Sequence, residues 1–502
     1  MMLQIVWCCF YIALFVFIIR KSAFFRLPEI NAPYVILLFL LKIVSAIFVW
    51  KLFVAAYPIS DADIYFDASK VMYDVFFKNK TIFLKLFFGI GDSPELQLLR
   101  THMQIWNTTS GSFLIVDSRT MIRLNALLRF FSLGYFNVHA IILCFLSFIG
   151  LTHLYKLFYP YFRHRSVWLI IACYLFPSLV FWSSAVLKEG ILFLGIGLTL
   201  YHCQCGLRTN YSYKNSIGLV VGVTLLVLIK MYVLLAMLPA LLANFWIANS
   251  NHKKIILKYV GAYIFFLFFL LSAHAISPSL DFGKVINKKQ TDFGNVAKGG
   301  RLFRHDSCFI YLDYRVVEDR LQQVAPHTFK LKDGYRYASF GLGKTDTTYI
   351  DSRDTNRFVP FLTLVPSQST FTIHKIKPNM IDILKNAPMA FVNILIIPSL
   401  FELDKAFAGL ILVENLILLI CLFASFFFLK KDMPLAMVLF CASFVFILFA
   451  LIGLTTPILG AVVRYRIPGI PFLIILTGLI INEKKIKNTF FKIKENLSKK
   501  AS

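Results

Sequence analysis

Residues 435–455 read LAMVLFCASFVFILFALIGLT and carry no charged side chain. A helix that crosses the apolar part of a bilayer needs about 20 such residues, so this stretch predicts a transmembrane helix. Similar runs recur along the whole chain. We therefore expect an all-α polytopic membrane protein with about eleven transmembrane helices, within a range of about ten to twelve. The expected spans lie near residues 3–19, 33–56, 135–158, 167–186, 190–206, 216–229, 231–248, 255–273, 406–429, 435–455 and 467–481.

The composition supports this class and argues against others. Of the 502 residues, 58% are hydrophobic and only 16% are charged, whereas a soluble domain carries roughly a quarter of charged residues. The net charge of +26 would indicate nucleic-acid binding if Lys and Arg clustered on a solvated face, but apolar runs separate them. We expect a membrane as partner and no nucleic acid.

Two features affect the expected number of spans. Residues 1–19 lack the basic start of a signal peptide, so we interpret them as an uncleaved anchor. The apolar runs on either side of Lys230 are short. They predict either a hairpin of two spans or one kinked helix.

The short connections indicate the orientation. Basic residues dominate every second one, and such loops stay on the cytoplasmic side. The two long connections then face outward. The expected organisation is two spans in residues 1–57, a first outer loop with interfacial helices in 58–134, spans three to eight in 135–273, a second outer loop with an interfacial helix in 274–405, spans nine to eleven in 406–482, and a basic cytoplasmic tail in 483–502.

A few ionisable residues fall at membrane depth, where an unpaired charge is costly and by default marks a functional site. Lys42 and Lys51 have an ordinary explanation, because a long lysine stem can reach the interface by snorkelling. The others are harder to explain in that way: Lys188, Glu189, Lys230, Glu414, Arg464 and Arg466.

The first outer loop opens with Ser60-Asp61-Ala62-Asp63-Ile64-Tyr65. Two carboxylates at this spacing could accept a proton from a hydroxyl, bind a divalent cation, or cap a helix that begins near Ile64. We predict Asp61 and Asp63 as catalytic residues, with Tyr65 in a supporting role. If the protein uses a divalent metal ion, these two carboxylates are its expected ligands.

Amphipathic segments near residues 81–90, 121–131 and 378–400 suit the membrane interface. The second of them places Arg123 and Arg129 on a polar face. Arginine binds phosphate well, so these two residues are candidates to support a phosphate site, or else they meet lipid headgroups. The rest of the second loop is rich in turn residues and predicts short strands, for instance near 308–317 and 358–365.

Some stretches of the sequence resemble known binding motifs but lack the context that such motifs need. Ala338-Ser-Phe-Gly-Leu-Gly-Lys-Thr345 fits a loose P-loop pattern, but it lies in an outward loop without a βαβ unit, so we expect no ATP. His202-Cys203-Gln204-Cys205 has no second ligand pair nearby, which argues against a metal site. Cys308 is the one cysteine in an outward loop, so no disulfide is expected within the loops.

The expected topology brings seven polar residues to the same boundary of the membrane: Asp61, Asp63, Lys188, Glu189, Lys230, Arg464 and Arg466. Such a boundary is the level of a lipid phosphate. Lysine and arginine would hold a departing phosphate, and an aspartate would accept the proton of an attacking hydroxyl. This pattern favours transfer of a phosphate-linked group from a membrane lipid.

In this organisation, Asp61-Ala-Asp63-Ile-Tyr65 and Arg464-Tyr-Arg466-Ile-Pro468-Gly-Ile-Pro471 resemble the GT-C superfamily of integral-membrane glycosyltransferases, which use polyprenyl-phosphate sugars. Residues 123–129, 176–189 and 414–415, together with the stretch that begins at Arg464, resemble a poorly characterised group of bacterial membrane proteins.

The resemblance implies a hexosyl or pentosyl transferase of the bacterial inner membrane, with a glycan or lipid acceptor. It implies inverting transfer with Asp61 or Asp63 as base, and a phosphate site drawn from Lys188, Lys230, Arg464 and Arg466. Glu189 and Glu414 would support that site. The acidic motif follows the second expected span, whereas in GT-C enzymes it usually follows the first.

Other functions fit parts of the pattern. A polysaccharide polymerase or ligase needs the same carboxylates and cations but takes a lipid-diphosphate glycan. A transporter of lipid-linked glycans should show internal repeats and broken polar helices at mid-membrane, whereas the polar residues here lie at one face. A non-catalytic scaffold is a further alternative, because polar turns can serve folding alone.

Overall fold

A computed structural model describes residues 2–489 except 57–59, 92, 104–105, 107–116, 210–211, 251–252, 278–279, 299–300, 306–307, 313–320, 326–327, 333–335, 341–346, 352–358, 364–366, 368, 398–405 and 487. The P-loop-like stretch and the basic tail therefore lie largely outside the described residues. In the described part, eight helices are long and apolar enough to cross a membrane. The chain is a helical, multi-pass membrane protein.

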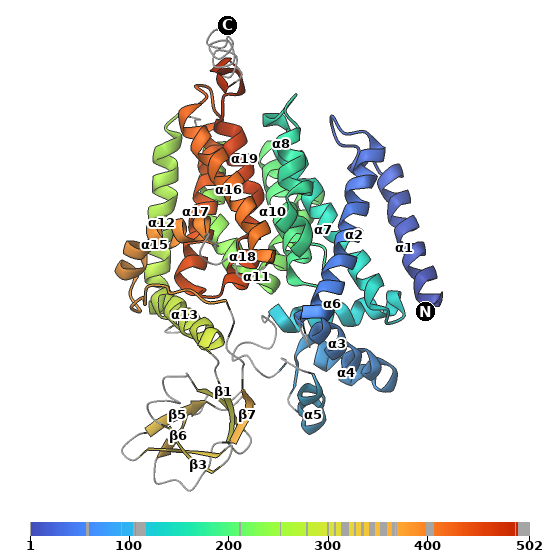
Figure 1. Cartoon of the computed structure of the whole chain (residues 1–502), viewed down its shortest axis with the longest axis vertical. Coiled ribbons are helices and arrows are strands. Elements are labelled where there is room, and N and C mark those ends of the chain that lie inside the picture. The colour runs from blue at the N-terminus through green and yellow to red at the C-terminus, as the bar shows by residue number, and fades with distance from the viewer. Residues whose placement is uncertain are drawn as a thin grey trace.

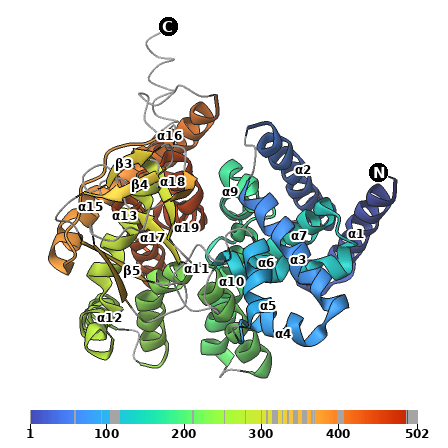
Figure 2. The same ribbon diagram turned by 90° about the horizontal axis from the view of Figure 1, so that it is seen from below.

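The long helices form one bundle (Figure 1). They are α1 (Met2–Lys21), α2 (Ala32–Ala56), α7 (Phe136–Phe158), α10 (Lys188–Thr209), α11 (Tyr213–Ala248), α12 (Ile255–Ile276), α16 (Ala406–Phe427), α17 (Leu435–Thr455) and, through the short α18 (Leu459–Tyr465) and η6 (Ile467–Gly469), α19 (Ile470–Ile480). Seen along the bundle, α10 and α11 lie between the N-terminal helices and the C-terminal group (Figure 2).

The span expected at 167–186 is broken into α8 (Val167–Ile170), the π-helical η3 (Ile171–Leu175) and α9 (Pro177–Trp182). The break falls at Phe176, whose backbone is extended (φ −64°, ψ 120°). The residue before a proline is disfavoured in the α-helical region, and Pro177 lacks the N–H that a continuous helix would use. The turn after α9 ends directly at Lys188.

Helix α11 reverses direction at Lys230, whose backbone leaves the helical region (φ −149°, ψ 77°). Asn215 and Asn244 both lie near the C-terminal part of α10: Asn215 Oδ1 is 3.0 Å from His202 Nδ1, and Asn244 lines a small cavity together with Gln204. In one straight helix these two asparagines would stand about 44 Å apart. The two halves therefore form a hairpin, with Lys230 at its tip.

The ends of the helices separate two faces of the bundle. At one end, Arg165 pairs with Glu483 (2.7 Å), Tyr159 donates to Glu29 (3.0 Å), and Lys430 N–H donates to the carbonyl of Ile480. We call this the basic end, because the basic short connections meet there. Both long connections lie at the opposite end, the loop end (Figure 1). This separation agrees with the alternation expected from the sequence.

The first long connection folds into α3 (Asp61–Lys78), α4 (Lys80–Phe88), α5 (Pro94–His102) and α6 (Asp117–Ser132). Helix α6 packs on α3 and covers the loop end of the bundle. Arg129 ties the two helices together, because its guanidinium donates to Ser69 Oγ (2.8 Å) and to the carbonyl of Phe66 (2.6 Å). The expected interfacial segment near 81–90 corresponds to α4, with Leu84 and Phe88 exposed.

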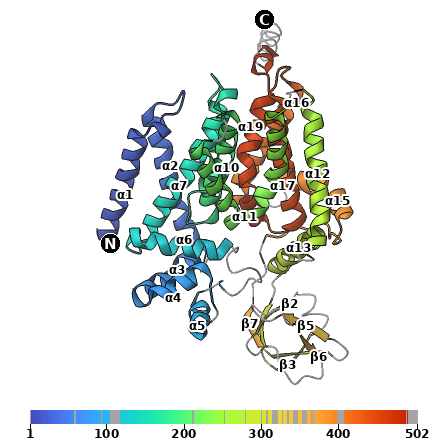
Figure 3. The ribbon, with the colours of Figure 1, turned by 180° about the vertical axis from the view of Figure 1, so that it is seen from behind.

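The second long connection contains α13 (Phe282–Lys298), α15 (Met380–Ile396) and short strands, which lie beyond α13 at the loop end (Figure 3). Among the described residues, β1 (Arg301–His305) pairs antiparallel with β2 (Cys308–Leu312) and β7 (Val359–Thr363). Two further antiparallel pairs are β3 (Leu321–Ala325) with β4 (Thr328–Leu331), and β5 (Arg336–Phe340) with β6 (Thr347–Asp351). The strands expected near 308–317 and 358–365 are present as β2 and β7. The expected all-α architecture therefore applies to the membrane part of the chain and not to the second outer loop.

Candidate functional site

Asp63 caps helix α3. Ser60 has an extended backbone and its hydroxyl accepts a hydrogen bond from Asp63 N–H (3.4 Å), while Asp63 Oδ2 accepts from Ser60 N–H (3.1 Å) and Oγ–H (2.7 Å). This reciprocal arrangement is a capping box. The structure therefore places the second carboxylate of the motif in the helix cap, which was one of the three roles expected for it.

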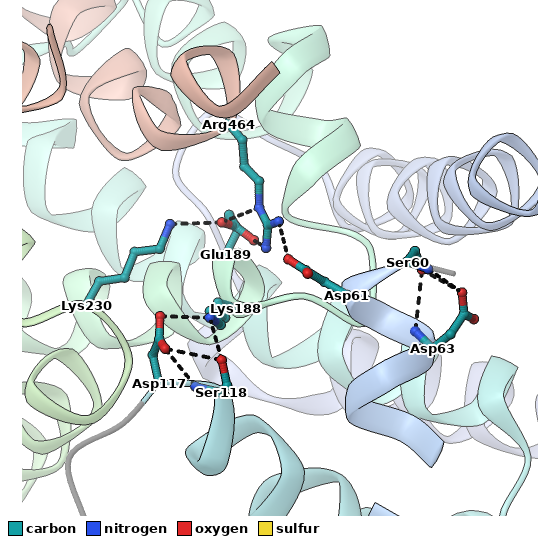
Figure 4. Close-up of polar contacts among 9 residues, drawn as sticks. All are labelled: Ser60, Asp61, Asp63, Asp117, Ser118, Lys188, Glu189, Lys230 and Arg464. Carbon is teal, nitrogen blue, oxygen red and sulfur yellow. Dashed lines mark hydrogen bonds and ion pairs between the residues drawn. The ribbon is translucent and has the colours of Figure 1, made fainter. Parts of the chain in front are cut away.

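Asp61 points away from Asp63 (Figure 4). Residues two apart on a helix lie on different faces, so the two carboxylates do not form a chelating pair. Asp61 Oδ2 instead accepts from Arg464 Nη1 across 2.7 Å. With Asp63 bonded to Ser60 and Asp61 bonded to a guanidinium, the pair does not fit a shared divalent ion in this arrangement. In the described residues, no group of three His, Cys, Asp or Glu side chains could hold a metal.

Arg464 is the centre of the site and joins three segments far apart in the chain. Its Nε lies 2.9 Å from Glu189 Oε1 and its Nη2 lies 3.1 Å from Glu189 Oε2, so Glu189 holds it with both oxygens. The ring of Trp182 lies below the guanidinium, 5.6 Å from its carbon. The Glu189 side chain is fully buried, whereas 42% of the Asp61 side chain is exposed. The site is therefore open at Asp61.

Lys230 reaches Glu189 from the tip of the α11 hairpin. Its Nζ lies 2.9 Å from Glu189 Oε1 and 4.6 Å from the centre of the Tyr465 ring. Both Lys230 and Glu189 are buried. A buried carboxylate is tolerated when it is paired and hydrogen-bonded, and Glu189 satisfies this requirement through two cations.

Lys188 forms a second ion pair beside the first. Its Nζ lies 2.7 Å from Asp117 Oδ2, 3.3 Å from Ser118 Oγ and 5.3 Å from the centre of the Tyr65 ring. Burial alone would raise the pKa of Asp117, but the charge and hydrogen bond of Lys188 outweigh burial and hold that pKa below its usual value. Burial raises the pKa of Tyr65 to about 12, so its phenol stays protonated at neutral pH.

Sequence reasoning missed Asp117 and Ser118. Asp-Ser before an amphipathic run is an ordinary start for a helix, and its distance from Lys188 along the chain gives no hint of contact. The only available signal is that α6 begins with an acid at the membrane boundary, opposite an unexplained lysine.

The charges of this cluster balance. Arg464, Lys230 and Lys188 face Glu189, Asp61 and Asp117, and each cation touches at least one carboxylate. In such a balanced cluster, an incoming anion can gain a cation as partner by replacing a carboxylate. Of the two carboxylates on Arg464, Asp61 is the more easily replaced, because 42% of its side chain is exposed and it holds Arg464 through one contact, while the buried Glu189 holds it through two. The Asp117 side chain is equally exposed, but it pairs with Lys188.

Arg466 does not join this cluster. It turns to the opposite side, where its Nη1 donates to the carbonyls of Ile394 (3.2 Å) and Ile397 (3.3 Å). Glu414 lies on the same side and accepts from Ser178 N–H across 2.7 Å. Both side chains are buried. These two predicted site residues thus belong to a separate contact of α15, α16 and α9.

Arg123 and Arg129 also lie outside the cluster. Arg123 packs 5.2 Å from the centre of the Trp106 ring, and Arg129 packs 4.0 Å from that of Phe66. Burial, and then the nearby charge of Arg119, lower the pKa of Arg123 to about 10.

Lys42 on α2 differs from the expectation more sharply, since it is 1% exposed. The snorkelling interpretation is therefore wrong for Lys42, whereas Lys51 is exposed.

Comparison with known proteins finds no matching family model, no matching curated protein and no matching solved structure. A proposal about function must therefore rest on the chemistry of the cluster around Arg464.

Proposed function

We propose that this protein is a glycosyltransferase of the bacterial inner membrane that takes its sugar from a polyprenyl-phosphate lipid at the outer face. The observation that carries the proposal is the way Arg464 is held: Glu189 binds it with two buried oxygens, and the half-exposed Asp61 binds its remaining side. One cation is thereby fixed in position and can exchange one of its partners. With α11 as a hairpin, and with the α8–α9 segment and α16 as spans, the chain makes eleven passes in a GT-C-like organisation.

The exchange suggests a mechanism. The donor phosphate takes the place of Asp61 on Arg464, because its oxygens accept the same kind of charge-assisted hydrogen bond from a guanidinium as a carboxylate does. Displaced from the arginine, Asp61 is available as a general base. Lys188 and Lys230 add positive charge beside the phosphate while Glu189 and Asp117 hold them in place.

The chemical step is a single displacement at the anomeric carbon. The acceptor hydroxyl oxygen forms a bond to that carbon as the bond from the carbon to the phosphate oxygen breaks. The hydroxyl proton passes to Asp61, and the phosphate leaves with the bonding electron pair. Arg464 stabilises the charge that develops on the leaving oxygen.

A first experiment compares two conservative variants in cells that lack the native gene. We expect Asp61→Asn to abolish the surface glycan that the protein builds while its amount in the membrane stays normal. Asp63→Asn, one half-turn away on the same helix, serves as the matched control and should keep the glycan. Normal glycan in the Asp61→Asn strain would overturn the proposal.

A second experiment tests the phosphate directly. Polyprenyl phosphate should raise the melting temperature of the purified protein, whereas polyprenol, which has the same chain without the phosphate, should not. Arg464→Met should lose the difference between the two lipids. An equal effect of both lipids on the native protein would contradict a phosphate site.

A further inference from the structure

Lys42 is buried in the middle of α2, and its ammonium group contacts neutral oxygen atoms of one residue. Its Nζ lies 2.6 Å from Ser183 Oγ and 3.3 Å from the carbonyl oxygen of Ser183. A charge at membrane depth is costly and needs partners. Here the partners belong to the turn between α9 and α10, which suggests that the lysine holds that turn.

The turn at residues 183–187 leads directly into the candidate site, because Lys188 and Glu189 follow it. A second contact anchors the same turn, because Cys144 Sγ donates to the carbonyl of Ser184 (3.1 Å). On α2, Ser45 Oγ donates to the carbonyl of Val180 in α9, the helix just before the turn (3.4 Å). The carbonyl oxygen of Ser183 also lies 3.5 Å from the place where a Cβ on Gly190 would stand. The turn that Lys42 contacts therefore also lies beside the first turn of α10, next to Glu189.

Helix α2, which carries Lys42, also leads through a short connection into α3 and Asp61. The same lysine thus links the helix that precedes Asp61 with the turn that precedes Glu189. These are the two carboxylates that share Arg464. The packing of α2 against the turn therefore affects the position of Asp61 relative to Glu189.

We infer that Lys42 is a positioning residue, which fixes the turn at residues 183–187 against α2 and so sets the position of Glu189 relative to Asp61. The geometric part of this inference stands on the contacts above, and its consequence for sugar transfer rests on the proposed function. Lysine suits the role because an ammonium group can donate to both oxygens of Ser183 at once, and hydrogen bonds from a charged donor are stronger than those between neutral groups.

The native thiol of Cys144 provides a reporter for the turn, because it is fully buried and touches Ser184. In a full-length variant that keeps Cys144 as its only cysteine, we expect Lys42→Met to raise the rate of labelling by N-ethylmaleimide by about tenfold, since Met fills similar space but cannot donate to Ser183. Lys42→Arg retains the donors and should restore slow labelling. An unchanged rate in Lys42→Met would overturn the inference.

Two controls separate a local effect from general loosening. Lys51→Met changes an exposed lysine on the same helix and should leave Cys144 labelling as it is. A second variant that keeps only Cys441, buried in α17, should label at the same rate with and without Lys42→Met. A rise at Cys441 equal to that at Cys144 would show that Lys42 supports the whole bundle, and would also reject the inference.

The glycan supplies the functional readout. Lys42→Met should lose the glycan at normal protein levels, and Lys42→Arg should recover it. Normal glycan in Lys42→Met, with fast Cys144 labelling, would reject the link from Lys42 to transfer. The labelling arm does not depend on sugar transfer, whereas the Asp61→Asn experiment tests transfer alone, so the two ideas can fail separately.

Discussion

Arg464 Nη1 lies 2.7 Å from Asp61 Oδ2, and this contact joins the first turn of α3 to the segment that begins the last span. The two residues are far apart in the sequence, and Arg464 also binds Glu189 at the start of α10 (Figure 4). The contact makes the first outer loop part of the same site as the membrane helices.

Replacing Arg464 by lysine tests whether the shape of the cation matters as well as its charge. A lysine is a point charge and cannot place separate N–H groups on both oxygens of Glu189 and on Asp61. We expect Arg464→Lys to lower the rate of glycan formation by about 100-fold, similar to the loss of one positioned donor in other transfer sites. Pulse labelling of the surface glycan, corrected for protein amount, measures the rate. A rate near that of the native protein would show that charge alone suffices.

The helical membrane architecture was predictable because apolar runs about 20 residues long are typical of transmembrane helices. The alternation of basic connections also predicted that both long loops share one end. The same alternation brought Asp61, Lys188, Glu189, Lys230 and Arg464 to one level. The structure joins four of them, all except Lys188, in one network of contacts, and Lys188 pairs with Asp117 beside it.

The sequence did not show that the two members of a pair of like residues, two positions apart, have different roles. This applies to two such pairs. Asp61 and Asp63 look like one motif, as do Arg464 and Arg466, but on a helix such pairs face different sides. One member of each pair enters the network, and the other bonds to Ser60 or to the carbonyls of α15. The role of Asp117 could not be predicted from the sequence for another reason: its position depends on how the whole first outer loop packs.

The ion pair of Asp117 with Lys188 predicts a specific dependence on pH. The pKa of Asp117 is lowered in the folded protein, so its stabilising effect is complete above the ordinary aspartate value of about 3.9 and is lost as the pH falls through the lower folded value. We expect Asp117→Asn to lower the melting temperature near neutral pH, and the gap from the native protein to close below about pH 4. Melting curves in detergent between about pH 3 and 7 give this gap, and a gap that does not change with pH would contradict the ion pair.

The crossing of α7 and α10 predicts an intolerance to a single methyl group. A Cβ on Gly197 would collide with the backbone of Gly150, and a Cβ on Gly150 would collide with the backbone of Phe193. Because α10 begins with Lys188 and Glu189, pushing the helices apart also disturbs the site. We expect Gly197→Ala to cost about 1–3 kcal/mol of stability. Gly460→Ala, where no atom lies within 4 Å of the new methyl, should change stability by no more than about 1 kcal/mol. Equal melting temperatures for the two variants would show that the close crossing is absent.

The hairpin in α11 predicts where its two ends lie relative to the membrane. Ser212 precedes the helix and Asn249 follows it, and both residues are exposed. If the chain reverses at Lys230, single cysteines at these two positions in an otherwise cysteine-free protein should react with a membrane-impermeant maleimide from the same side. One continuous helix of 36 residues would instead be about 54 Å long and would place the two cysteines on opposite sides. Labelling of intact cells and of inverted membrane vesicles distinguishes these cases. If the two cysteines react from opposite sides, Lys230 does not lie at the level of Glu189. Glu189 would then lack the second of the two cations that hold its buried carboxylate.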